Sequence, residues 1–254
     1  MRNKPTIAVF KFTGCAGCQL EILHLEDQLL TITEVVDFAY WMMVKRKNLD
    51  GPYDISLVEG SVSTPREIEE IKKVRANTKV LVALGDCAVS GCIPSIKNWI
   101  PQQELKKTVY EDISVISSIK IHGIDEYVSV DAYLKGCPPD RNTVLELLRG
   151  YLLGVKSFIR QHPVCVECKL RENSCLITAQ NRPCMGPVTN AGCGALCPSL
   201  NRECEGCYGP MSNPNASSLA EIYTKIGLTG DEILRKFRKY AGTTPEFRRE
   251  AEAQ

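Results

Sequence analysis

The sequence lacks an excess of charge of either sign. Its 254 residues contain 31 Lys and Arg against 30 Asp and Glu. This balance provides no broad positive field that would attract nucleic acid or an anionic membrane surface. The composition therefore favours a small molecule or another protein as the partner.

Long apolar runs are also absent. No segment reaches the roughly 18 uninterrupted apolar residues of a membrane span, and the first twelve residues lack the apolar core and cleavage site of a signal peptide. We therefore expect a cytoplasmic protein without a membrane span. Because the cytosol keeps thiols reduced, a disulfide framework is not expected for the thirteen cysteines. Metal ligation is the better interpretation.

The cysteines are unevenly spread along the chain. Five lie in the first 137 residues, and eight lie in the 43 residues from Cys165 to Cys207. The first part alternates short apolar runs with amphipathic stretches, which is typical of an α/β fold. Cysteine, proline, glycine and asparagine dominate residues 161–210 instead. We predict one domain over residues 1–160 and a second over 161–254.

Five apolar runs are the predicted strands of the first domain. Several are continuous rather than alternating, as expected for the buried strands of a parallel sheet. They cover residues 6–12, 35–44, 54–60, 79–85 and 127–136.

The intervening stretches have helical periodicity. Leu20, Leu23 and Leu30 recur at helical spacing and predict one buried face, while the sequences TPRE at 64–67 and TGDE at 229–232 have capping-box spacing. The predicted helices cover residues 19–30, 65–77 and 142–154, with another in the tail after residue 229.

Four cysteines follow predicted strands of the first domain, namely Cys15, Cys18, Cys87 and Cys137. Ligands of open α/β sheets bind outside the carboxyl ends of the strands, so these thiols are expected at one edge. Four thiolates suit either zinc or a [4Fe-4S] cluster. The CxxC spacing of the first pair is also typical of a thioredoxin-like dithiol, but that interpretation does not account for Cys87 and Cys137. Cys92 is more simply a buried thiol outside the ligand set.

The eight later cysteines divide into two further sets of four. Cys165, Cys168, Cys175 and Cys184 are spaced at widening intervals, and Cys193, Cys197, Cys204 and Cys207 follow. Ligand type alone does not separate zinc from iron-sulfur clusters. Zinc ribbons usually present two tight knuckles, so the spacing favours clusters. His162 also has ligand spacing to Cys165, but four thiolates already complete that set.

Several motifs resemble the small, electron-transferring subunits of nickel-iron hydrogenases over at least residues 5–210. They are GCAGC at 14–18, EGSVS at 59–63, GDCAVSG at 85–91, GCPP at 136–139, and PCMGPVTNAGC at 183–193 leading to CEGC at 204–207. The similarity is greatest to the cytoplasmic archaeal type found in sulfhydrogenases and methyl-viologen-reducing hydrogenases. The resemblance implies an anaerobic oxidoreductase with three [4Fe-4S] clusters.

The resemblance also implies where each cluster is bound. A flavodoxin-like domain over residues 1–160 would hold the proximal cluster, and an irregular domain with short helices over 161–254 would hold the medial and distal clusters, ending in a helical tail. The implied ligands are Cys15, Cys18, Cys87 and Cys137 for the proximal cluster, Cys193, Cys197, Cys204 and Cys207 for the medial cluster, and Cys165, Cys168, Cys175 and Cys184 for the distal cluster. Cys197 stands where some relatives have proline.

Two residues near the proximal motif call for separate interpretation. Cys92 stands where many relatives have a second glycine, and its role stays open. Glu59 of EGSVS ends a predicted strand at the edge that carries the cysteines. It is a candidate to support the cluster ligands or to relay protons, and the alternative is an ordinary solvated carboxylate.

In the resembling family a separate large subunit binds the nickel-iron centre, and this chain would carry electrons to a further redox subunit. That acceptor could be of the flavin and NAD(P), heterodisulfide reductase or ferredoxin type. One alternative is the related subunit of respiratory complex I, which uses adjacent cysteines and a single cluster. The other is a zinc-stapled structural module.

Overall fold

A computed structural model describes residues 4–155 and 160–253. The chain forms two compact units, Met1–Leu134 and Lys135–Gln254. The division falls earlier than the boundary predicted after residue 160, because the segment after Leu134 is bonded to the later cysteine-rich segment. Lys135 Nζ donates to the Pro210 carbonyl over 2.8 Å, and the Asp140 N–H donates to the Tyr208 hydroxyl over 2.9 Å. The assignment of cluster sites to 1–160 and 161–254 stays a prediction.

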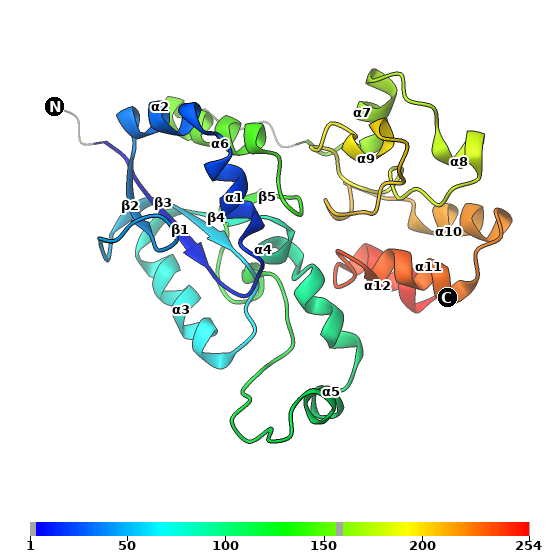
Figure 1. Ribbon diagram of the computed structural model, residues 1–254, viewed down its shortest axis with the longest axis horizontal. Coiled ribbons are helices and arrows are strands. Elements are labelled where there is room, and N and C mark those ends of the chain that lie inside the picture. Colours follow the sequence, from blue (N-terminus) through cyan, green and yellow to red (C-terminus); the bar gives the residue numbers. More distant parts are fainter. Residues whose placement is uncertain (1–3, 156–159, 254) are drawn as a thin grey trace. The chain divides into compact units, whose positions relative to one another are not determined.

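The first unit is built on a parallel sheet of five strands in the order β2-β1-β3-β4-β5 (Figure 1). The strands are β1 Thr6–Lys11, β2 Asp37–Trp41, β3 Tyr53–Glu59, β4 Thr78–Leu84 and β5 Ala132–Leu134. This is the flavodoxin-like strand order, in which the chain switches direction across the sheet between β1 and β3. The predicted α/β class and parallel sheet are confirmed.

The carboxyl ends of the strands are level. Lys11 pairs with Glu59, Glu59 pairs with Leu84, and Leu84 pairs with Leu134. The loops that follow β1, β3, β4 and β5 therefore leave the same edge of the sheet. β5 is shorter than predicted because the apolar residues just before it, including Tyr127, Val128 and Val130, pack onto the core from a loop.

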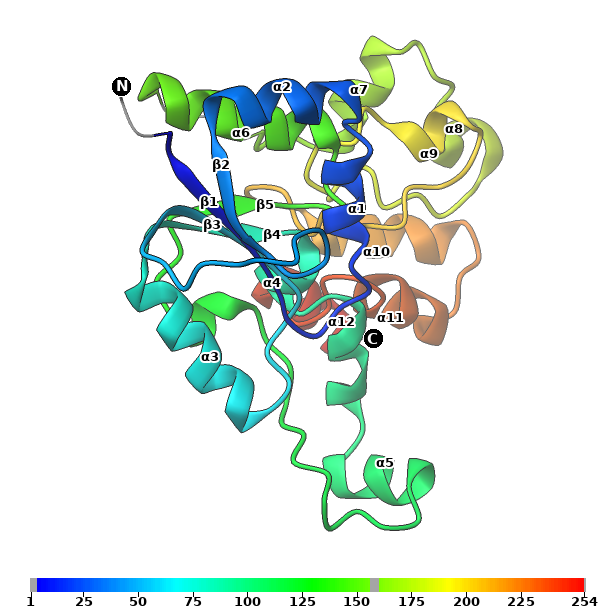
Figure 2. The same ribbon diagram turned by 60° about the vertical axis from the view of Figure 1, so that its left-hand side comes forward.

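Helices cover both sides of this sheet: α1 and α2 lie on one side and α3 on the other (Figures 1 and 2). The helices of the unit are α1 Gly17–Leu23, α2 Asp27–Val35, α3 Pro65–Ala76, α4 Asp86–Ser90 and α5 Gln102–Val109, with 3₁₀ turns η1 Ile93–Trp99 and η2 Ile124–Glu126. The capping box that opens α3 is confirmed.

The single helix predicted over 19–30 is wrong. Glu26 adopts a positive φ of 49° and separates α1 from α2. The predicted apolar face is also wrong, because Leu20 and Leu30 are 41% and 66% exposed while Ile22 and Leu25 are buried.

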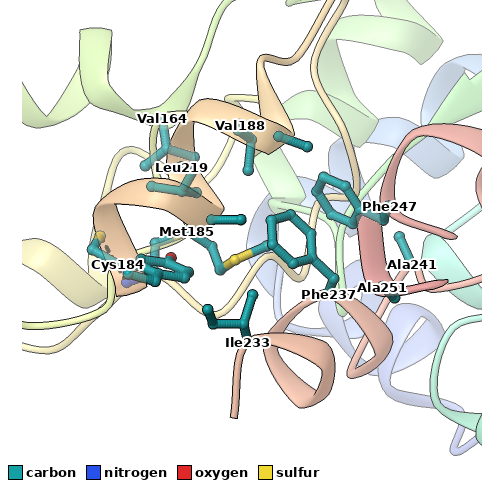
Figure 3. Packing of buried hydrophobic residues seen from close by; sticks show 14 of the residues in the cluster. Val164, Cys184, Met185, Val188, Leu219, Ile233, Phe237, Ala241, Phe247 and Ala251 are labelled. Atoms are coloured by element: carbon teal, nitrogen blue, oxygen red, sulfur yellow. Dashed lines mark hydrogen bonds between the residues drawn. The ribbon is translucent and has the colours of Figure 1, made fainter. Parts of the chain in front are cut away.

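The second unit contains short helices, and a hydrophobic core lies among those that follow residue 160 (Figure 3). Its helices are α6 Arg141–Leu153, α7 Val164–Leu170, α8 Leu176–Gln180, α9 Leu196–Ser199, α10 Ala216–Lys225, α11 Gly230–Arg238 and α12 Pro245–Glu252. Met185 and Val188 of the cysteine-rich segment pack with Leu219 of α10, Phe237 of α11 and Phe247 of α12. The tail thus supplies apolar surface that the cysteine-rich segment lacks, and its predicted capping box at Thr229 is confirmed.

Within the described ranges, no helix has both the length and the apolar character needed to cross a bilayer.

Candidate iron-sulfur sites

The GCAGC motif forms the turn between β1 and α1. Ala16 adopts a left-handed φ of 69°, and α1 begins at the next residue. The Gly17 N–H donates to Cys15 Sγ over 3.4 Å. Cys15 is exposed and Cys18 is buried, so the turn holds one thiol at the surface of the chain and one inside it.

The loop after β3 is hydrogen-bonded to this turn. The Thr13 N–H donates to the Ser61 carbonyl over 3.0 Å, and the Ser61 N–H donates back over 2.9 Å. Gly60 has a φ of +92°, and a Cβ at this position would lie 2.6 Å from the Phe12 carbonyl carbon. The glycine of EGSVS therefore permits the close approach of the two loops.

Glu59 is buried beneath the cysteine turn, with 1% of its surface exposed. Its Oε1 accepts from the Cys18 N–H over 3.1 Å, and its Oε2 accepts from Gln19 Nε2 over 2.7 Å. Gln19 Oε1 in turn accepts from Trp41 Nε1 over 2.8 Å. The solvated-carboxylate interpretation is therefore wrong, and Glu59 links the end of β3 to the start of α1.

Cys87 and Cys92 differ in their surroundings. Cys87 is half-buried in the short helix α4, directly after β4, and Cys92 is fully buried beyond the end of that helix. Cys92 has a positive φ of 43°, and its carbonyl accepts from the hydroxyl of Ser95 over 2.6 Å. The prediction that Cys92 is buried is confirmed.

Cys137 is half-buried and belongs to the second unit. Leu84 and Leu134 are paired where β4 and β5 end. Cys87 lies three residues after Leu84, and Cys137 lies three residues after Leu134. The convergence of Cys137 with Cys15, Cys18 and Cys87 on one cluster stays a prediction.

The cysteines predicted as distal ligands are close enough to influence one another. Cys165 and Cys168 lie one turn apart on α7, and Cys175 precedes α8. Burial, reinforced by the charges of Cys184, Cys168 and Cys175, raises the pKa of Cys165 to about 11. Gly186 faces the same sulfurs, since a Cβ there would lie 3.4 Å from the Sγ atoms of both Cys165 and Cys184.

Of the cysteines predicted as medial ligands, Cys193 precedes α9, Cys197 lies in it, and Cys204 and Cys207 follow it. Burial raises the pKa of Cys193, opposed by the backbone N–H groups of Leu196 and Ala195 and assisted by the charges of Glu167 and Cys197. Burial also raises the pKa of Cys204. The two predicted sets meet where the Cys204 N–H donates to Cys184 Sγ over 3.2 Å.

The chain matches the sequence profile of the family described as "NADH ubiquinone oxidoreductase, 20 Kd subunit" over residues 15–151. Sulfhydrogenase 2 subunit delta of Pyrococcus furiosus is 36% identical over 237 residues, which cover 92% of this chain and 98% of the relative. A subunit of the F420-non-reducing hydrogenase vhu of Methanococcus voltae is 30% identical, and the match covers 92% of both chains. The chain belongs to the family of hydrogenase small subunits.

Solved structures agree with this family. A chain of an NAD⁺-reducing [NiFe]-hydrogenase in the H2-reduced state has a TM-score of 0.55 and 29% identity, covering 62% of this small subunit and 96% of the solved chain. A chain of the Ni-Fe-Se hydrogenase from Desulfomicrobium baculatum shares the fold over 87% of this small subunit, with a TM-score of 0.55 and 16% identity.

The donor sets of this small subunit fit iron-sulfur clusters, whose usual ligands are cysteine thiolates. In residues 4–155 and 160–253, no group of three or more Cys, His, Asp or Glu side chains is placed to hold a single metal ion. Backbone N–H groups also point at cysteine sulfurs, from Gly17 to Cys15 and from Cys204 to Cys184, as is usual around clusters whose sulfurs carry negative charge.

Two supporting groups could not be identified from the sequence. Glu167 lies between Cys165 and Cys168, and its carboxylate accepts from the N–H groups of Gly192 and Ala195 over 3.0 and 3.3 Å. It thereby orders the loop that carries Cys193. The one hint of this role in the sequence is the position of Glu167 inside a CxxC motif. Gln19, beside Cys18, is the second such group.

His162 lies beside the cysteines predicted as distal ligands. Its Nδ1 is 3.3 Å from the carbonyl oxygen of the neighbouring Pro163. The prediction that four thiolates complete the set without this imidazole stays a prediction.

Proposed function

We propose that this chain carries electrons between the H2-splitting nickel-iron centre of a separate large subunit and a redox partner, through three [4Fe-4S] clusters. The observation that carries the proposal is the distribution of twelve of its thirteen cysteines into three sets of four. The family membership supports the reaction class, an oxidoreductase that acts on H2 as part of a complex.

Each set has a proposed place in the electron path. Cys15, Cys18, Cys87 and Cys137 would bind the proximal cluster, Cys193, Cys197, Cys204 and Cys207 the medial cluster, and Cys165, Cys168, Cys175 and Cys184 the distal cluster. When bound, such clusters supply one-electron carriers whose reduction potentials span about −700 to +450 mV and depend on burial and hydrogen bonds.

The residues of the chain would hold these carriers in place. Glu59 fixes the Cys18 end of the first turn, and Glu167 fixes the loop before Cys193. N–H groups directed at sulfur stabilise added negative charge, so they favour the reduced state. The burial of Cys184 and Cys204 keeps water from the sulfurs and so strengthens these interactions.

The proposed partners are the large subunit with its nickel-iron centre and a further redox subunit. The relatives include subunits of an NAD⁺-reducing and of an F420-non-reducing hydrogenase. We include flavin and NAD(P), heterodisulfide reductase and ferredoxin types as the classes of acceptor. No nucleic-acid partner is proposed, since the charges of the chain balance.

Metal analysis of chain purified without air tests the proposal. Three four-iron clusters require about 12 irons and a matching amount of sulfide per chain. About 8 irons would show that one set is misassigned, and about 4 would favour the single cluster of a complex I-like subunit. A colourless protein with stoichiometric zinc would overturn the proposal in favour of a zinc-stapled module.

A further inference from the structure

Tyr223 of α10 carries a buried hydroxyl group. The side chain is 0% exposed, and its oxygen has no hydrogen-bond partner among the described residues. A hydroxyl removed from water without a partner lowers stability. The position therefore suggests a partner that is not a protein group.

The surroundings of this hydroxyl are rich in thiols. Tyr223 belongs to the same hydrophobic core as Cys184 and Cys204. Burial raises the pKa of Tyr223, and the charges of Cys184, Cys204, Glu205 and Cys165 act in the same direction. Toward an anionic sulfur, which has no proton to give, a phenol hydroxyl can act only as a donor.

Glu205, the nearby carboxylate, is engaged elsewhere. Its two oxygens accept from Lys236 Nζ over 3.1 Å and from Lys239 Nζ over 2.9 Å. The second buried tyrosine of the unit, Tyr208, shows the usual arrangement, since its hydroxyl accepts from the Asp140 N–H. Tyr223 departs from that arrangement at the place where the two C-terminal cysteine sets meet.

We propose that the Tyr223 hydroxyl donates a hydrogen bond to a sulfur of one of the two clusters proposed at the C-terminal cysteines. The inference rests on the proposed function, because it requires a cluster at these thiols. Tyr223 shares its core with Cys184 of one set and Cys204 of the other, and the Cys204 N–H donates to Cys184 Sγ, so the hydroxyl lies where the two sets meet. Donation to sulfur stabilises the reduced, more negative state and raises the reduction potential. Tyr223 is thus a positioning residue that tunes one step of the electron path.

The substitution Tyr223→Phe in the complete complex tests this role. It removes only the hydroxyl, so iron content is expected to stay unchanged. In a redox titration followed by electron paramagnetic resonance, the midpoint potential of one cluster should become more negative while the other two stay in place. Ile233→Val is the matched control, because Ile233 packs in the same core and has no polar group; it should move no potential.

A spectroscopic signature separates hydrogen bonding from packing. After exchange into D2O, electron-nuclear double resonance of the reduced cluster should show a coupled deuteron that is lost in Tyr223→Phe. If the wild-type complex holds all three clusters, but the variant retains both the potential and the deuteron signal, the inference is wrong and the proposed function stands. If the wild-type chain binds no iron at these cysteines, the proposed function fails first.

Fluorotyrosine at position 223 decides the matter if Tyr223→Phe does not assemble. The substituted ring keeps the shape of the residue, and its more acidic hydroxyl is a stronger donor. The potential of the same cluster should then become more positive. An unchanged potential would overturn the inference.

Discussion

Cys87 of α4 and Cys92, which follows the end of that helix, have different predicted roles. Cys87→Ala leaves three thiolates for the proposed proximal cluster, so iron content should fall by about 4 per chain and H2-dependent dye reduction by the complex should be lost. Cys92→Ala removes a single buried sulfur, and alanine adopts the positive φ at this position no more readily than cysteine does. It should cost at most a few kcal/mol, roughly 1 to 3, of stability.

Iron assays and electron paramagnetic resonance of the two reduced variants distinguish the cysteines. Cys92→Ala should retain the proximal signal, the iron and the activity. Loss of that signal in Cys92→Ala with retention in Cys87→Ala would show that the ligand is the other cysteine.

Glu59 provides a second prediction for a single residue. Glu59→Gln replaces one carboxylate oxygen by an NH2 group, which would face either the Cys18 N–H or the Gln19 amide. One buried donor then loses its acceptor, and the cost is about 1–3 kcal/mol. The thermal midpoint of the variant should fall, measured at a fixed scan rate. Glu69→Gln is the control, because Glu69 is exposed on α3; an equal fall in both variants would contradict the supporting role of Glu59.

The role of Glu59 also shows how far single residues could be interpreted from the sequence. Its place at the end of a strand beside GCAGC was visible, because parallel strands bring their carboxyl ends to one edge. Its burial was not, since that depends on Gln19 and Trp41, which lie 40 and 18 positions away in the chain. Glu167 was missed for the same reason: the N–H groups that it binds come from a loop later in the sequence.

At the scale of elements, the contact between the β1–α1 and β3–α3 loops depends on Gly60. Gly60→Ala should destabilise the chain more than Gly227→Ala does. The two glycines have similar φ values of +92° and +98°, but a Cβ at Gly60 meets the Phe12 backbone at 2.6 Å whereas nothing lies within 4 Å at Gly227. Backbone strain alone costs about 1–3 kcal/mol in either variant, and the clash adds to it only at Gly60.

The thermal midpoints of these two variants, with their iron contents, provide the measurement. Gly60→Ala should also lose iron, because the loop that it displaces is hydrogen-bonded to the cysteine turn. Equal midpoints would contradict the steric argument.

Elements were predicted well where local signals agree with packing. The strands over 54–60 and 79–85 were found within a residue of β3 and β4, because continuous apolar runs at these places are buried on both sides. The helix over 19–30 was wrong, because its leucine spacing does not reveal the break at Glu26. The strand over 127–136 was too long, because apolar residues in a loop can pack on a core without pairing.

At the scale of the whole molecule, ligand counting limits what the chain can do alone. The three proposed sets of four leave Cys92, which is buried, as the one cysteine without a proposed cluster. The isolated chain with full clusters should therefore neither consume nor evolve H2, whereas its complex with the large subunit should do both. Gas measurements on the two preparations test this, and turnover by the isolated chain would contradict the electron-transfer role.

The core of the second unit bears on attempts to build a small electron carrier from this chain. The rings of Phe237 and Phe247 in the tail meet edge to face, with their centroids 5.5 Å apart. They pack in the same core as Met185 and Val188 (Figure 3). A shorter protein that kept only the cysteine-rich segment and ended near Pro210 would lack the residues of α10, α11 and α12 that cover this core. Its apolar side chains would then be exposed to water and prone to association. The transplantable module therefore extends through α12, and its redox part and its scaffold have to be moved together.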